Sequence, residues 1–162
     1  MKLFVEVLAS SANEKRLVAR VKKTALFAVN RLPKTASRKL LKMRTAPYVL
    51  EVAFFSPKKI QALNHSYRKK NKPTDVLSFD GAPYSPSLGQ LALCWKVIKD
   101  QAMDFNVPAE EELDRMVIHG LLHLFGYEHE KNRAQAKKMF ALQEKIVASL
   151  HGIKVRRGQL FK

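Results

Sequence analysis

The sequence predicts an α+β fold, a single domain over residues 1–162 with about four strands and about five helices packed on them. A chain of 162 residues is the length of one domain, and its 46% hydrophobic content is ample for a core. Short apolar runs suit strands, whereas longer segments with apolar residues every three or four positions suit helices. Together these features describe an α+β arrangement.

Four segments are predicted as strands because they are short, apolar and rich in β-branched or aromatic residues. They are residues 3–8, 48–55, 75–79 and 90–95. Between the first two strands, residues 34–46 form a cationic connector that could hold a short helix around residues 37–43. Two prolines and a glycine predict a turn or loop over residues 80–88.

The helices are expected over about residues 11–32, 57–68, 96–105, 108–125 and 133–150. Ser11 or Asn13 can cap the first of them, and Ser56 followed by Pro57 is a typical helix start. Gly152 ends the last helix.

Three of the five histidines, His119, His123 and His129, are spaced as ligands of one metal ion. His119 and His123 are four residues apart, so on a helix both imidazoles project from one face. Gly126 then favours a left-handed turn that would bring His129 back towards them. Three imidazoles suit Zn²⁺ and leave a coordination position open, as in catalytic sites. Nickel or copper would also accept these ligands.

Charge is the second strong signal. The chain has 30 lysines and arginines against 14 acids, a formal net charge of +16. Such an excess favours a polyanionic partner, most often nucleic acid. Residues 1–45 carry much of it, and Arg68, Lys69, Lys70 and Lys72 form a second cluster.

The sequence contains no sign of a membrane protein. No apolar run reaches the roughly 18 residues of a membrane span, and the N-terminal residues lack the hydrophobic region of a signal peptide. The single cysteine, Cys94, lies in an apolar run and suits a buried thiol in a reducing compartment. We therefore expect a cytoplasmic location and no membrane partner.

Two blocks of sequence, residues 63–79 and 119–129, resemble the YbeY family of bacterial endoribonucleases. The resemblance implies a mixed sheet, one zinc ion held by the three histidines, and Arg68 as the basic cleft residue needed for activity. It also implies ribosomal RNA and the ribosome or its small subunit as partners. The expected role is maturation of the 3′ end of the small-subunit RNA and ribosome quality control.

The residues suit cleavage of single-stranded RNA. A metal ion can act as a Lewis acid on a phosphoryl oxygen, and the Arg68 guanidinium could bind a phosphate and offset transition-state charge. Lys69, Lys70 and Lys72 would follow the phosphate backbone without reading bases.

Two alternatives remain, and the sequence also departs from the family. The histidine spacing occurs in metzincin metallopeptidases, but those enzymes place a glutamate general base directly after the first histidine, where this chain has Gly120. A non-catalytic ribosome-associated RNA-binding factor would use zinc structurally, yet structural sites usually have four ligands.

Gln90 stands where the family usually has an acid, which puts any role of that acid in doubt.

Overall fold

A computed structural model describes residues 3–33, 47–82, 85–130 and 132–153. Within these ranges it has one four-stranded mixed sheet, the one-turn helix α1, and five helices of ten or more residues, which confirms the α+β prediction. The strands are β1 (Leu3–Leu8), β2 (Tyr48–Phe54), β3 (Val76–Asp80) and β4 (Ser87–Leu93). The helices are α1 (Ala12–Lys15), α2 (Val18–Arg31), α4 (Pro57–Arg68), α5 (Trp95–Asp104), α6 (Ala109–Leu124) and α7 (Arg133–His151).

The strand order is β1-β2-β4-β3, with β1, β2 and β4 parallel and β3 antiparallel to β4 at one edge. The register aligns Glu6, Glu51, Gln90 and Phe79 in one row across the sheet. Helix α4 covers part of this face, where Ile60 packs against a small cluster that includes the buried Cys94. No other described element covers the remainder of this face, which lines a cleft.

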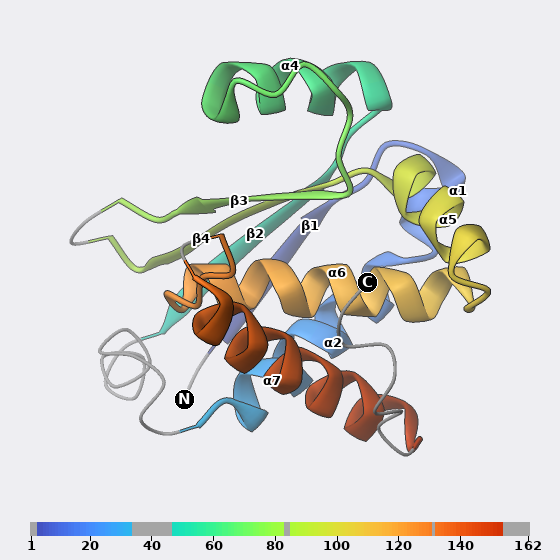
Figure 1. The fold of residues 1–162 in the computed structure, drawn as a ribbon. Coiled ribbons are helices and arrows are strands. Elements are labelled where there is room, and N and C mark those ends of the chain that lie inside the picture. The colour runs from blue at the N-terminus through green and yellow to red at the C-terminus, as the bar shows by residue number, and fades with distance from the viewer. Residues whose placement is uncertain (1–2, 34–46, 83–84, 131, 154–162) are drawn as a thin grey trace.

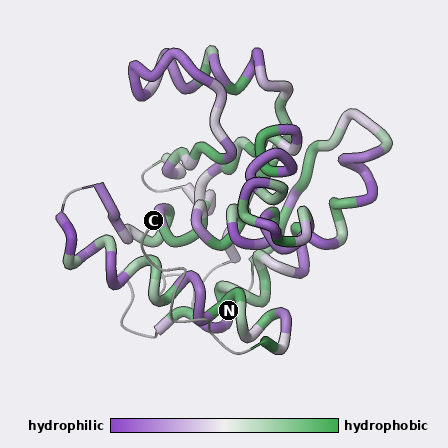
Figure 2. Tube along the Cα trace, turned by 45° about the vertical axis from the view of Figure 1, so that its right-hand side comes forward, coloured by the Kyte–Doolittle hydropathy of each residue, from purple (hydrophilic) through white to green (hydrophobic). Residues whose placement is uncertain are grey.

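The helices form layers on both sides of the sheet (Figure 1). Helix α4 lies above it, and α6 runs beneath it with α2 and α7 farther below. The hydropathy view shows α4 as mostly hydrophilic along its length (Figure 2), whereas ten residues of α6 are buried. Helix α6 is therefore the central helix of the core. No helix among the described residues is long and apolar enough to cross a membrane.

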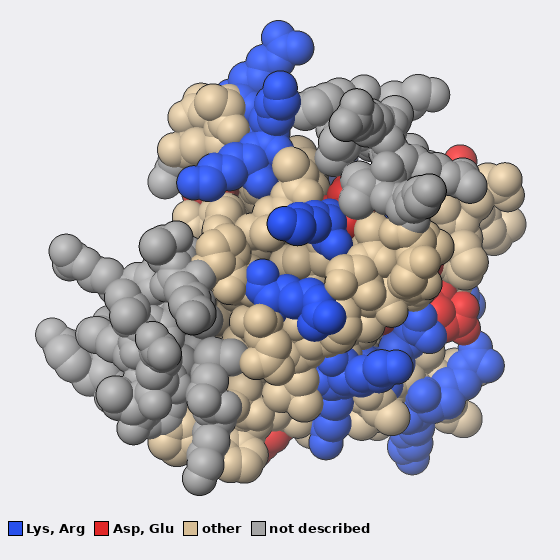
Figure 3. Space-filling model, turned by 90° about the horizontal axis from the view of Figure 1, so that it is seen from below, with Lys and Arg blue, Asp and Glu red and all other residues tan. Residues whose placement is uncertain are grey.

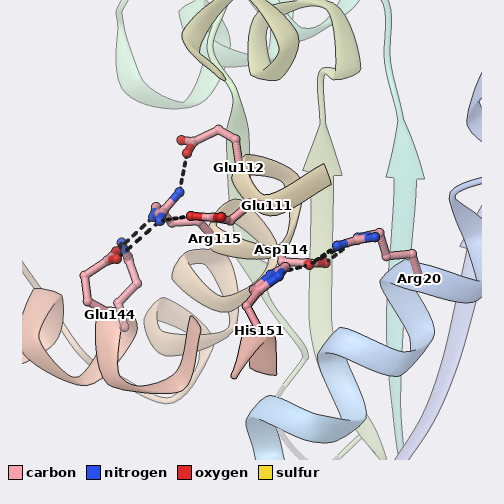
Figure 4. A network of polar contacts seen from close by, with 8 residues as sticks. Arg20, Glu111, Glu112, Asp114, Arg115, Glu144 and His151 are labelled. Carbon is pink, nitrogen blue, oxygen red and sulfur yellow. Dashed lines mark hydrogen bonds and ion pairs between the residues drawn. The ribbon is translucent and has the colours of Figure 1, made fainter. Parts of the chain in front are cut away.

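Two polar networks fix the N-terminal half of α6 (Figure 4). The buried Asp114 carboxylate accepts hydrogen bonds from the Arg20 guanidinium at 2.8 Å and the Thr24 hydroxyl at 2.6 Å, and the His151 Nε2 atom lies 3.0 Å from it. These contacts join α2 and α7 to α6. Arg115 follows Asp114 in the chain, and its guanidinium donates to three carboxylates, those of Glu111, Glu112 and Glu144.

The first predicted helix is wrong in one respect, because the structure divides it. Ser11 caps α1 in a capping box with Glu14, whose carboxylate accepts from the backbone N–H groups of Ser10 and Ser11. The Leu17 N–H then bonds to the Glu14 carbonyl, and this tight turn carries Leu17 into the core before α2 begins. A short helix around residues 37–43 would lie outside the described residues.

Strand β4 also differs from prediction: it begins at Ser87 and ends at Leu93. Pairing with β2 and β3 extends it into the expected loop, and Cys94 becomes the N-cap of α5. The caps predicted at Ser56 and Gly152 are confirmed, since the Ser56 hydroxyl accepts from the Lys59 N–H and Gly152 has φ +65°.

Candidate metal centre

The C-terminal half of α6 presents His119 and His123 on one face, as their spacing predicts. Their Nε2 atoms are 3.1 Å apart. The Gly126 backbone, at φ +84°, ends the helix, and the Tyr127 N–H turns back to the Leu122 carbonyl at 3.0 Å. This reversal brings His129 to the pair, so that one nitrogen of each imidazole lies within 4.8 Å of the other two. The three residues can hold one metal ion.

Gln143, on α7, orients the first of these imidazoles. The side chain is buried, and its Oε1 lies 2.8 Å from His119 Nδ1. The Gln143 amide nitrogen donates to Glu144, itself held by Arg115, so the amide oxygen faces the ring. An amide oxygen can only accept, so Nδ1 carries the proton and the Nε2 lone pair is directed to the cluster. This tautomer suits metal binding.

Burial sets the charge of the cluster. Desolvation lowers the pKa of His119 to about 4, aided by His123 and His129 and opposed by the hydrogen bond to Gln143. Desolvation and the neighbouring His123 also lower the pKa of His129. The Glu128 carboxylate lies 3.5 Å from His123 Nδ1. At neutral pH, His119 and His129 are therefore neutral, as metal ligands must be.

Gly120 allows α6 to approach the sheet. A Cβ atom there would meet Leu91 Cδ2 at 2.7 Å, and Ser78 Oγ and Val76 Cγ2 at 3.2 Å. The Ser78 hydroxyl donates to the Gly120 carbonyl at 3.2 Å. A side chain at position 120 would therefore require the Leu91 side chain to shift, so the glutamate that a metzincin peptidase carries there would not fit this packing unchanged.

A cleft of about 1220 Å³ opens beside the cluster and extends onto the uncovered face of the sheet. The three histidines, Arg68 and Phe140 all line it, and the Phe140 ring lies 5.3 Å from that of His129. The Arg68 guanidinium donates to the Glu130 carboxylate. Although desolvation raises the pKa of Glu130, the Arg68 and Lys70 charges lower it overall.

The three predicted RNA-binding lysines lie beside this cleft but do not line it. Lys69, Lys70 and Lys72 are all exposed. The Lys70 ammonium lies 3.5 Å from the Glu130 carboxylate, and the Lys69 ammonium donates to the Ser66 carbonyl at 3.1 Å. The structure therefore brings Arg68 to the histidines and leaves the lysines at the rim.

Gln90 occupies a place where an amide fits better than an acid. Its side-chain nitrogen donates to the Glu51 carboxylate at 2.9 Å, and Glu6 lies next in the same row of the sheet. A carboxylate at position 90 would face a like charge directly across the strands, which is destabilising. The departure from the family pattern is therefore compensated within this chain.

Sequence reasoning missed two residues of the site. Gln143 occurs on the apolar stripe of α7, where a buried polar side chain is a usable signal of a polar partner. Phe140 gave no signal, because an aromatic residue in an amphipathic helix is expected in any core.

An α+β domain that gathers three imidazoles in an open cleft has the organisation of a metal-dependent hydrolase. The family model described as "Endoribonuclease YbeY" matches residues 11–151. The chain therefore belongs to the YbeY endoribonuclease family.

Individual relatives agree with this assignment. An "Endoribonuclease YbeY" of Thermodesulfovibrio yellowstonii is 35% identical over 161 residues, covering 93% of this chain and 99% of the relative. One from Bdellovibrio bacteriovorus is 42% identical over 107 residues, covering 66% and 71%. A solution structure of a Thermotoga maritima protein matches with a TM-score of 0.59 at 28% identity, covering 92% of this chain and 90% of that one.

Proposed function

We propose that this protein is a metal-dependent endoribonuclease that cleaves single-stranded RNA, with His119, His123 and His129 as ligands of one zinc ion. The observation that carries the proposal is the histidine cluster, whose His119 Nε2 lone pair is directed inward by Gln143. Zinc is proposed because three imidazoles and an open position are its usual catalytic set. When bound, the ion would supply Lewis-acid stabilisation to a phosphoryl oxygen.

Arg68 is proposed to bind the phosphate next to the scissile bond. Its guanidinium lines the same cleft as the histidines and is held by Glu130 in the free protein. Because this ion pair is exposed, it contributes little stability, and a phosphate can replace the carboxylate at small cost. Lys69, Lys70 and Lys72 would then contact the flanking backbone at the rim.

A single strand is the substrate that the cleft favours. Duplex RNA is recognised mainly by shape across its wide minor groove, whereas an unpaired strand can place its backbone beside the histidines and Arg68 in the cleft. We propose ribosomal RNA, at the 3′ end of the small-subunit RNA, as the physiological substrate, with the ribosome as partner and the cytoplasm as the location. These assignments rest on the family resemblance.

The test combines metal analysis with two substrates. Wild type, His123→Ala, Arg68→Glu and the control Lys59→Glu are incubated with unstructured RNA, and wild type also with casein. We expect RNA cleavage by wild type and Lys59→Glu, bound zinc in all but His123→Ala, and no activity in the two site variants. RNA cleavage that survives both site substitutions would refute the site, and casein cleavage would favour a peptidase.

A further inference from the structure

The charge of the cleft lining is opposite in sign to the net charge of the protein. Among the described residues, seven charged side chains line the cleft, and six of them are acidic; Arg68 is the exception. The chain nevertheless carries a net charge of +16. Apart from Arg68, the described lining of the cleft would offer a polyanion little attraction, so cations outside the cleft would supply most of it.

Helix α7 places cations in a row on its outer surface. Arg133, Lys137 and Lys145 are exposed and share a spacing of four residues with Ala141 and Ser149. Such residues lie one above another on a helix, and the row from Arg133 to Lys145 spans about 18 Å. The Ser149 hydroxyl accepts a hydrogen bond from Arg31 Nε at 3.0 Å, which carries the row onto α2.

We define the α7 ridge as Arg133, Lys137, Lys145 and Arg31. In the view from below, lysine and arginine side chains extend across this side of the molecule with few acids between them (Figure 3). The ridge also adjoins the catalytic cleft, because Phe140 lines the cleft and is an i,i+3 neighbour of Lys137.

Helix stability does not explain this row. Cations in the first turn of a helix oppose its dipole, and like charges four residues apart repel by a few tenths of a kcal/mol. Helix α7 has no acid in its first turn, and its single carboxylate, Glu144, is engaged by Arg115. A bound polyanion would relieve both costs.

We propose that the α7 ridge binds the phosphate backbone of RNA outside the cleft and guides the strand to the histidine cluster. This inference rests on the proposed function and adds to it a second contact surface. The ridge would add affinity to that of the rim lysines, through charge and without base recognition, whereas cleavage would occur in the acidic cleft.

The experiment compares two double variants of equal charge. Lys137→Gln with Lys145→Gln removes two ridge cations, and Lys58→Gln with Lys59→Gln removes two exposed cations from the start of α4. Cleavage of RNA of about 20 nucleotides and of a tetranucleotide is measured with the zinc-loaded enzyme from low to high salt. Binding of the longer RNA is measured by fluorescence anisotropy.

The ridge variant is expected to raise KM for the longer RNA about 25-fold at 0.1 M salt and to lower the salt slope of its binding by about 1.4, since each phosphate contact contributes about 0.7. Its kcat and its cleavage of the tetranucleotide should not change. The α4 variant should match wild type on both substrates.

Equal behaviour of the two double variants would overturn the proposal, as would an equal loss on the tetranucleotide. Loss of binding to anionic lipid vesicles without any change in RNA binding would assign the ridge to a membrane surface instead. If wild type cleaves no RNA, the proposed activity fails, and the anisotropy measurement still decides whether the ridge binds RNA.

Discussion

The two halves of α6 both carry buried polar side chains, but they use them differently. In the N-terminal half, Asp114 accepts hydrogen bonds from α2 and has His151 of α7 beside it, and Arg115 donates to three carboxylates (Figure 4). In the C-terminal half, the nearest polar neighbour of His119 Nε2 in the described chain is another imidazole nitrogen, at 3.1 Å.

The difference separates a structural polar site from the proposed metal site. Opposite charges close to each other satisfy the Asp114 and Arg115 networks internally, so those networks hold three helices together. The three imidazoles offer no opposite charge to one another, and their spacing is one that an added cation could bridge. The pattern of partners, more than burial, distinguishes the two sites.

The largest effect is expected from a substitution in the histidine cluster, in the C-terminal half of α6. His123→Ala removes one proposed metal ligand, and RNA cleavage should fall by roughly a thousand-fold or more, since a metal ion supplies several kcal/mol of transition-state stabilisation. Bound metal and cleavage rates are measured beside His65→Ala, a change to an exposed histidine. Retained metal with retained activity would remove His123 from the site.

A substitution in the N-terminal half of α6 should lower the stability of the protein. Asp114→Ala leaves Arg20 and Thr24 without their buried acceptor, and the free energy of unfolding should fall by about 3–5 kcal/mol. Asp100→Ala breaks an exposed pair with Lys96 and should cost less than about 1 kcal/mol. Urea unfolding measures both, and equal losses would contradict the distinction.

The two halves should also differ in their response to pH. His119 has a folded pKa of about 4 against 6.5 when unfolded, so between these values the unfolded state binds a proton that the folded state does not. The stability of metal-free protein should therefore fall as pH drops from 6.5 to 4, by up to about 3 kcal/mol. His119→Gln should flatten this dependence in urea unfolding at pH 7 and pH 5. If wild type and His119→Gln lose the same stability between pH 7 and pH 5, the pH dependence arises from other groups.

Gln143 connects the two halves, because it joins His119 to the Glu144–Arg115 network. Gln143→Leu removes the acceptor that fixes the His119 tautomer, so zinc affinity should weaken by about 10–100-fold. Chelator competition measures the affinity, with Gln135→Leu, an exposed change on the same helix, as the control. Equal affinities in the two variants would show that Gln143 only fills space.

The smallest effect is expected at the rim. Glu130→Gln frees Arg68 from its carboxylate partner, so KM for RNA should fall a few-fold, whereas stability should change by less than about 1 kcal/mol because the pair is exposed. Steady-state cleavage is compared with Asp104→Asn, an exposed acid of α5. An unchanged or higher KM would indicate that Glu130 does not compete with phosphate.

Local features were predictable from the sequence to the extent that their causes are local. The i,i+4 spacing of His119 and His123 and the turn at Gly126 depend on helix geometry and glycine conformation alone. The division between α1 and α2 was missed, because hydrophobic spacing continues through Arg16 although a capping box closes the first turn.

By itself, the sequence determined the α+β class, the presence of four strands and the spacing that brings three histidines together, since short-range periodicity and backbone preference specify them; the bounds of β4 depended on its pairing with β2 and β3. Only the tertiary structure decided which distant side chains complete the site. Gln143 reaches His119 across the α6–α7 interface, Glu130 holds Arg68, and the Leu91 side chain packs where a Cβ atom at Gly120 would lie. These contacts depend on packing between elements far apart in the chain, and local sequence patterns do not predict such packing.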